Sequence, residues 1–124
     1  SVNTTTYDFG VVAVSSTTNS TNTMFAITNL STVQTDQTIY VTSNWTGGAG
    51  WTHSDTATAG ADTAGMKAIR GGDIIVKTSP APNFLYENCA AATNYTFGLS
   101  LLAPTSFTDG VQKAVTVRVS AAAG

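Results

Sequence analysis

Apolar and polar residues alternate in short runs along this chain, and Gly, Asn, Asp, Ser or Pro separates one run from the next. A period of two residues places alternate side chains on opposite faces of a β-strand. No stretch sustains the period of 3.6 residues that an amphipathic helix requires. Thr, Val, Ile, Tyr and Phe, which favour strands, fill the runs. The pattern predicts strands at residues 7–14, 23–28, 38–43, 65–70, 73–77, 95–101 and 111–119.

Short strands with turn residues about every 8–12 positions are typical of a β-sandwich. We therefore predict an all-β fold, an immunoglobulin-like β-sandwich of seven to eight strands, in a single domain that spans residues 1–124. Gly71-Gly72 predicts a two-residue hairpin turn between two of the strands. Residues 52–64 are small and polar, and we expect a long loop there with at most a short β-edge.

The same alternation predicts which side chains face inward. The expected core consists of Phe9, Phe25, Ile27, Ile39, Val41, Ile69, Ile75, Phe97, Leu99, Val115 and Val117. Trp45 and Trp51 flank a Gly-rich turn, and we expect them to pack at one end of the sandwich. The alternative is that they act with Tyr40 and Tyr86 as stacking platforms for a carbohydrate.

Composition adds an unusual surface. The chain has 23 Thr and 11 Ser in 124 residues, and its charged residues make up 10%, against about 25% in an ordinary soluble domain. Weak mutual repulsion favours association between copies. The five basic residues are scattered and the net charge is −2, which argues against nucleic acid as a partner. No apolar run approaches the roughly 20 residues of a membrane helix, so we expect no membrane insertion.

The sequence begins at Ser1, which suggests a mature form after removal of a signal peptide and predicts an extracellular or cell-surface location. The alternative is a trimmed chain. Acceptor motifs for N-linked glycans, Asn-x-Ser/Thr, occur at Asn3, Asn19, Asn29, Asn44 and Asn94. These are candidate glycosylation sites, although a chain so rich in Thr also produces such motifs incidentally.

Catalytic side chains are scarce. The chain has one His, one Cys and one Glu, and no G-x-S-x-G nucleophile motif. His53 lies near Asp55, and we expect it to be a surface residue rather than a base. The dispersed acidic residues show no D-x-D spacing, so no metal site or cofactor is predicted. A single Cys allows no intrachain disulfide, and we expect Cys89 to be buried and inert, with an intermolecular cross-link as the alternative.

Several short motifs occur together in this chain: residues 7–10 (Tyr-Asp-Phe-Gly) before 11–14, residues 27–29 (Ile-Thr-Asn), Trp51 after a Gly-rich turn, residues 112–117, and the ending 121–123. With them the chain resembles small secreted single-domain β-sandwich proteins of poorly studied bacterial lineages. More loosely, it is similar to extracellular filament subunits built by donor-strand complementation, in which a terminal strand of one subunit completes the sheet of the next. Neither resemblance implies catalytic residues.

The first hypothesis for function is therefore structural: an extracellular subunit, not an enzyme, that binds copies of itself to form a filament, tube or surface layer. An edge strand with few charges is a template for another chain. Residues 1–14 are the candidate donor or edge strand, and the predicted subunit contacts are Val2, Tyr7, Phe9, Val12 and Val14. Ordinary pairing of the same strand within its own sheet is the rival. The second hypothesis is a secreted carbohydrate-binding module that uses Trp45 and Trp51.

Overall fold

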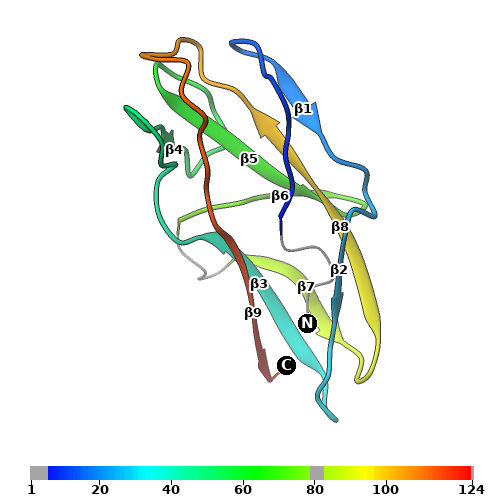
Figure 1. Ribbon diagram of the computed structural model, residues 1–124. Helices are drawn as coiled ribbons and strands as arrows, with labels where there is room; N and C mark the ends of the chain where they lie inside the picture. The colour runs from blue at the N-terminus through cyan, green and yellow to red at the C-terminus, as the bar shows by residue number, and fades with distance from the viewer. Residues whose placement is uncertain (1–5, 79–82, 124) are drawn as a thin grey trace.

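The computed structural model describes residues 6–78 and 83–123. In this part of the chain the fold is all-β without a helix, and nine strands form two sheets (Figure 1). The strands are β1 (Thr17–Asn19), β2 (Phe25–Thr28), β3 (Thr35–Val41), β4 (Thr52–His53), β5 (Thr63–Ile69), β6 (Asp73–Ile75), β7 (Phe84–Cys89), β8 (Asn94–Leu102) and β9 (Val117–Ala123).

The larger sheet is centred on β5 and β8, which pair antiparallel. β1 and β2 both pair with the other edge of β8, opposite residues 100–102 and 94–97 respectively. On the far side of β5, the short β4 pairs parallel and β6 pairs antiparallel. The smaller sheet has β3 between β7 and β9, with both pairs antiparallel. An isolated parallel bridge between Tyr40 of β3 and Lys77, two residues after β6, connects the two sheets.

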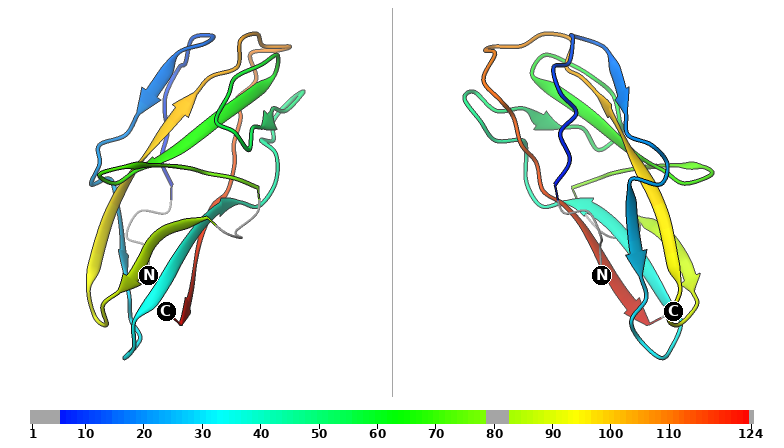
Figure 2. Two further views of the ribbon diagram at one scale, coloured as in Figure 1. Left: turned by 180° about the vertical axis from the view of Figure 1, so that it is seen from behind. Right: turned by 45° about the vertical axis from the view of Figure 1, so that its right-hand side comes forward.

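One hydrophobic core lies between the two sheets, which appear as separate layers in Figures 1 and 2. The larger sheet supplies Phe25, Ile27, Met66, Ala68, Phe97, Leu99 and Leu101, and the smaller sheet supplies Ile39, Val41 and Leu85. Six of the predicted core residues are confirmed as buried: Phe25, Ile27, Ile39, Val41, Phe97 and Leu99. Phe9, Val115 and Val117 are only partly buried and pack against the edge of this core.

The β5–β6 hairpin forms where Gly71-Gly72 predicts it, but with a different turn. Ile69 pairs with Asp73, so the connection has three residues, and Gly71 takes a positive φ of 92°. The inward prediction for Ile69 and Ile75 is wrong, because Met66, Ala68 and Ile74 face the core instead. Only every second residue of a strand faces the core, and in β5 these residues are Ala64, Met66 and Ala68, so Ile69 faces away.

Four strands differ from the alternation pattern at the level of whole elements. The pattern predicts neither β1 nor β7, and β3 begins three residues before the expected start at residue 38. The β3–β7 pairing shifts register twice, on either side of Gln37, and Asn88 has a positive φ of 54°. Such bulges insert an unpaired residue and interrupt a two-residue period. β9 lies at Val117–Ala123 rather than at 111–119, and its Ala-rich end pairs with β3.

Candidate functional site

The N-terminal segment, residues 6–14, runs along one side of the molecule, between β1 and the chain that leads into β9 (Figures 1 and 2). Three of the predicted subunit contacts, Tyr7, Phe9 and Val12, are partly buried against the core. The ring centroid of Tyr7 lies 5.0 Å from that of Phe9 and 6.0 Å from that of Phe25. The segment is therefore held to its own domain by apolar side chains.

The remaining predicted contacts are placed differently. Val14 is 51% exposed, and its neighbour Val11 is completely exposed. Val2 lies outside the described residues. Just after the segment, the backbone N–H of Ser15 donates to the carbonyl of Pro104 at 2.9 Å, which fixes the point where the chain turns toward β1. The structure thus brings together only part of the predicted contact set.

The predicted strand at residues 7–14 does not form in this structure. Among the described residues, no backbone hydrogen bond joins residues 6–12 to any strand. Gly10 has a positive φ of 75°, and its N–H donates to Asp8 Oδ1 at 2.7 Å in a local turn. This bend interrupts the ladder geometry that a strand needs and leaves Val11 facing solvent.

A groove of about 300 Å³ opens between the larger and the smaller sheet. Ile27 and Leu30 line it from β2 and the turn that follows, and Val119 and Ala121 line it from β9. Leu30 is 75% exposed. Within the described residues β9 has a strand neighbour only on its β3 side. The groove therefore combines apolar and polar lining residues, and within the described chain it borders a strand edge without a strand neighbour.

The glycosylation candidates divide by burial. Asn19, Asn44 and Asn94 are exposed, while Asn3 lies outside the described residues. Asn29 is only 4% exposed and is corrected to a structural residue. Its Nδ2 donates to the carbonyls of Val33 and Cys89, both at 2.9 Å. A glycan attached to that nitrogen would break both bonds and would have no space in the folded chain.

The stacking role considered for Trp45 and Trp51 is not available in this fold, because their side chains are 6% and 8% exposed. The ring of Trp51 lies 5.5 Å from that of Trp45 and stacks on Phe107 at 5.5 Å. The expectation that both tryptophans pack inside the fold is confirmed. Trp51 Nε1 is buried without a hydrogen-bond partner in the described residues.

The surface position expected for His53 is wrong, because this residue is 4% exposed. Trp45 Nε1 donates to His53 Nδ1 at 3.2 Å, and His53 Nε2 lies 2.5 Å from the carbonyl oxygen of Val76. An indole N–H can only donate. Nδ1 must therefore accept, and Nε2 carries the proton that is donated to Val76. His53 links β4 to the end of β6 and has no access to a substrate.

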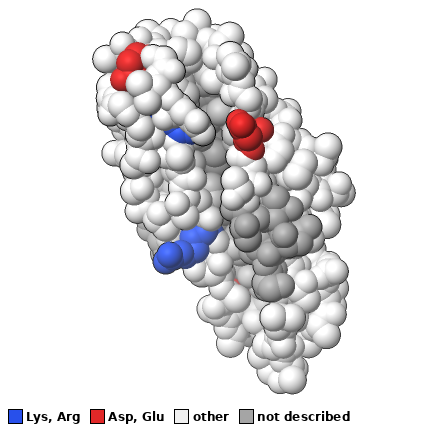
Figure 3. Space-filling model, in the orientation of Figure 1, with Lys and Arg blue, Asp and Glu red and all other residues white. Residues whose placement is uncertain are grey.

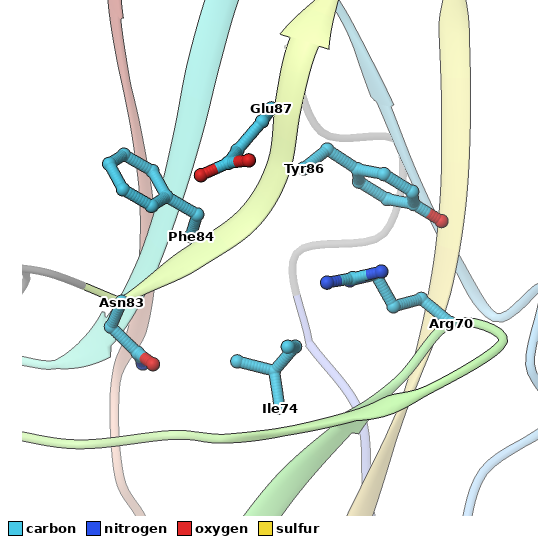
Figure 4. Close-up of a pocket in the computed structure, with 6 residues that line it drawn as sticks. All are labelled: Arg70, Ile74, Asn83, Phe84, Tyr86 and Glu87. Carbon is cyan, nitrogen blue, oxygen red and sulfur yellow. The ribbon is translucent and has the colours of Figure 1, made fainter.

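A second, larger pocket of about 510 Å³ opens at the β5–β6 hairpin and β7 (Figure 4). Arg70 points into it from the hairpin, and Glu87 lies on the opposite wall beside Phe84. The Arg70 guanidinium carbon lies 5.3 Å from the centre of the Tyr86 ring. Arg70 Nε is buried and has no hydrogen-bond partner in the described residues. Alternation gave no sign of this pocket, because its walls come from both sheets and from the unpredicted β7.

Lys113 and Asp109 connect two loops through an ion pair and hydrogen bonds. In the described part of the chain the one ion pair joins Lys113 Nζ to Asp109 Oδ1 at 2.5 Å. The same Nζ donates to the carbonyl of Gly47 at 2.7 Å, and the N–H of Ala49 donates to Asp109 at 2.8 Å. These bonds, above all that from Lys113, lower the pKa of Asp109 to about 2. No group of His, Cys, Asp or Glu in the described residues is placed to hold a metal ion.

Cys89 is fully buried at the end of β7, as predicted for an inert side chain. Burial raises the pKa of its thiol, which disfavours the reactive thiolate. The described residues contain no helix of the length and apolarity that crossing a membrane requires.

No family model matches this chain, and neither a curated protein nor a solved structure was found to resemble it. The resemblance to secreted β-sandwich proteins and to filament subunits therefore stays a prediction. The arguments for function that follow rest on the geometry of the chain itself.

Proposed function

We propose that this chain is an extracellular structural subunit that assembles with copies of itself into a filament, tube or surface layer. In the assembly the N-terminal segment of one subunit leaves its own domain and pairs with the next subunit. The observation that carries the proposal is the way residues 6–14 are held: by partly buried side chains, without a backbone ladder to any strand among the described residues. Such a segment can exchange between copies at low cost.

Exchange also gains burial that the isolated chain does not have. Tyr7, Phe9 and Val12 exchange one apolar surface for an equivalent one on the neighbour, whereas Val11 and Val14 are exposed in the single chain. Full burial of the exposed Val11 contributes about 1.5 kcal/mol or more, and burial of the half-exposed Val14 contributes about half as much. The groove beside β9 offers a surface for them, because Ile27, Leu30 and Val119 line it. A head-to-tail contact of this kind does not close on itself and produces an open fibre.

The surface supports repeated contacts between copies. The face seen in Figure 3, which includes the N-terminal segment, carries few charged side chains. β9 carries one charged residue, Arg118, and ends in three alanines. Natural edge strands avoid edge-to-edge pairing with charge, proline or bulges. In β9 this protection is sparse, so its open edge is suited to accept a strand from another copy.

The proposal includes the finer features expected from the sequence. The two sheets and the core between them support an immunoglobulin-like sandwich, which an experimental structure of the assembled subunit would test.

The abundance of Thr and Ser supports an extracellular location. Asn19, Asn44 and Asn94 remain the accessible glycan acceptors, and mass spectrometry of the native protein would show whether any is occupied. We propose no catalytic activity.

The test combines electron microscopy with a truncation. Deleting residues 1–8 should give a folded chain that does not polymerise, and adding a peptide of residues 1–14 should restore binding in trans. Circular dichroism and analytical ultracentrifugation measure the two properties separately. If the truncated chain still forms filaments, donation by the N-terminal segment is wrong. If the full-length chain stays a monodisperse monomer at high concentration, the structural role is wrong as well.

A point variant avoids loss of the buried aromatic contacts. Val11 is fully exposed in the single chain, so Val11→Asp should leave folding unchanged while it weakens assembly. Thr21→Asp, at an exposed turn outside the segment, is the matched control and should assemble normally. Equal assembly of Val11→Asp and the unmodified chain would exclude burial of this segment in the polymer.

The alternative function, a carbohydrate-binding module, cannot use Trp45 and Trp51 to stack on a sugar, because both side chains are buried. Of the other aromatic residues considered for it, Tyr40 is partly buried on β3, where its hydroxyl lies 3.4 Å from that of Ser120. Tyr86 alone lines a pocket. A carbohydrate-binding role therefore depends on the Arg70 pocket rather than on the tryptophans.

A further inference from the structure

The Arg70 pocket contains an unusual cation for this chain. Arg70 is partly buried at the β5–β6 hairpin, and its guanidinium makes no ion pair and no hydrogen bond within the described residues. Its one resolved partner is the face of the Tyr86 ring at 5.3 Å. A buried N–H without a partner costs free energy unless a ligand or water satisfies it. The arginine therefore presents donors that no hydrogen bond within residues 6–78 and 83–123 uses.

Two residues of the pocket wall are held in defined positions. Tyr86, on which Arg70 lies, donates its hydroxyl hydrogen to the carbonyl of Thr96, and its ring is 5.0 Å from that of Tyr95. On the pocket's other side, Asn83 Nδ2 donates to the carbonyls of Ile39 and Ile75 at 2.8 and 2.7 Å. Both walls are thus fixed by bonds to neighbouring strands before any ligand arrives, which lowers the entropy cost of binding.

We propose that this pocket binds an acidic sugar, a uronic acid residue of a polysaccharide, through its carboxylate. The planar arginine fork matches a carboxylate with two parallel hydrogen bonds. Glu87, on the opposite wall, accepts hydrogen bonds from sugar hydroxyls, and Ile74 and Phe84 offer apolar surface to the C–H face of the ring. The volume of about 510 Å³ lies within the usual range of small-ligand pockets.

The same side chains discriminate against other anions. The dianion of a phosphate monoester has no hydroxyl hydrogen on its phosphate group to donate to Glu87, and the Glu87 carboxylate repels its two negative charges more strongly than the single charge of a carboxylate. Nucleic acid requires several clustered cations, whereas Arg70 is the only basic residue that lines the pocket in the described chain. A monoanion that also donates hydroxyl hydrogens satisfies both Arg70 and Glu87. This inference does not depend on self-assembly.

The experiment is an NMR titration of the full chain with tri-galacturonic acid, with neutral tri-galactose as the matched sugar. We expect shifts at the amides of β7 and the β5–β6 hairpin with the acid, and at least tenfold weaker binding of the neutral sugar. Arg70→Gln should weaken binding of the acid about 10- to 100-fold, the range for charge-assisted hydrogen bonds. Arg118→Gln, which removes an exposed arginine on β9, is the control and should bind normally.

Each other outcome overturns the proposal. Equal binding of the neutral sugar would exclude recognition of the carboxylate, and unchanged binding by a folded Arg70→Gln variant would place the acid elsewhere. Absence of binding by the folded full chain would exclude the site. A third titration uses free glutamate, which has carboxylates but no sugar ring. If glutamate binds as tightly as the uronide, the pocket recognises carboxylates in general and the assignment to acidic sugars is wrong.

Discussion

At the scale of single residues, buried polar side chains tie the loops of this protein to its strands. Asn29 and His53 are each about 4% exposed, and each bonds segments that are distant in the sequence. Substitution of either residue would leave a backbone carbonyl without its hydrogen-bond donor. Because charges are few, such neutral hydrogen bonds take the place that ion pairs have in other proteins. Their loss should therefore reduce stability rather than solubility.

Asn29→Ala is expected to destabilise the fold by about 1–3 kcal/mol, because the carbonyls of Val33 and Cys89 lose their donor in a buried place. Urea unfolding followed by circular dichroism measures the change. Asn19→Ala, at an exposed position of β1, is the control and should change stability by less than about 0.5 kcal/mol. Equal stability of the two variants would show that the Asn29 bonds contribute nothing.

Titration gives a second prediction at the residue scale. The pKa of Asp109 falls from an ordinary 3.8 to about 2 through bonds from Lys113, Ala49 and Val111. A depressed folded-state pKa contributes stability that is present above pH 3.8 and is lost as the pH falls toward 2. The unmodified chain should therefore be more stable than Asp109→Asn at pH 6. Urea unfolding between pH 6 and 2 should show this difference shrinking as the pH falls below 3.8, and a constant difference would contradict it.

At the scale of elements, the path from β1 to β2 depends on one glycine in β8. The N–H of Leu99 donates to Ser20 Oγ at 2.8 Å, and the N–H of Ser20 donates to the carbonyl of Leu99 at 2.9 Å. These bonds hold the connection between the two strands in close contact with Gly98. A Cβ atom there would lie 2.4 Å from the carbonyl oxygen of Thr21, a distance that real side chains do not reach.

Gly98→Ala is therefore expected to destabilise the protein by about 1–3 kcal/mol through overpacking, since the backbone of Thr21 must move. Gly72→Ala in the hairpin has nothing within 4 Å of the added atom and should leave stability nearly unchanged. Thermal unfolding of both variants measures the contrast. A similar melting temperature for the two would mean that the β1–β2 connection adapts without cost.

At the scale of the whole molecule, two separate surfaces carry the two proposed functions. The groove beside β9 is lined by β2, β3 and β9 together with the turn after β2, whereas the Arg70 pocket lies at the β5–β6 hairpin and β7. The proposed self-assembly and the proposed ligand binding would therefore use different residues, so a filament could display the pocket along its length. Electron microscopy of filaments with and without the acidic sugar would show whether the two functions coexist.

Assembly should be sensitive to charge in the groove. Ala121→Lys places a cation among the lining residues Ile27 and Val119 and should block polymer growth without unfolding the chain. Ala122→Lys adds the same charge to the next residue of β9, which is exposed and does not line the groove. Sedimentation of both variants measures assembly. Normal polymers from Ala121→Lys would exclude the groove as the contact surface.

The sequence by itself determined the all-β class and much of the core. Phe25, Ile27, Ile39 and Val41 are buried as their alternation predicts, because a two-residue period is a local property of an extended backbone. The scarcity of catalytic side chains and charge was likewise visible without coordinates. Contacts with distant segments were not needed for any of these conclusions.

Only the tertiary structure decided where chain segments meet. The bulged pairing of β7 with β3 interrupts the period that sequence analysis depends on, and the Ala-rich end of β9 becomes a strand because β3 pairs with it. The bend at Gly10 keeps residues 7–14 out of a ladder. Burial of His53 and the pocket around Arg70 likewise depend on elements far apart in the sequence. Local pattern cannot report such contacts, because their partners are chosen by packing across the whole fold.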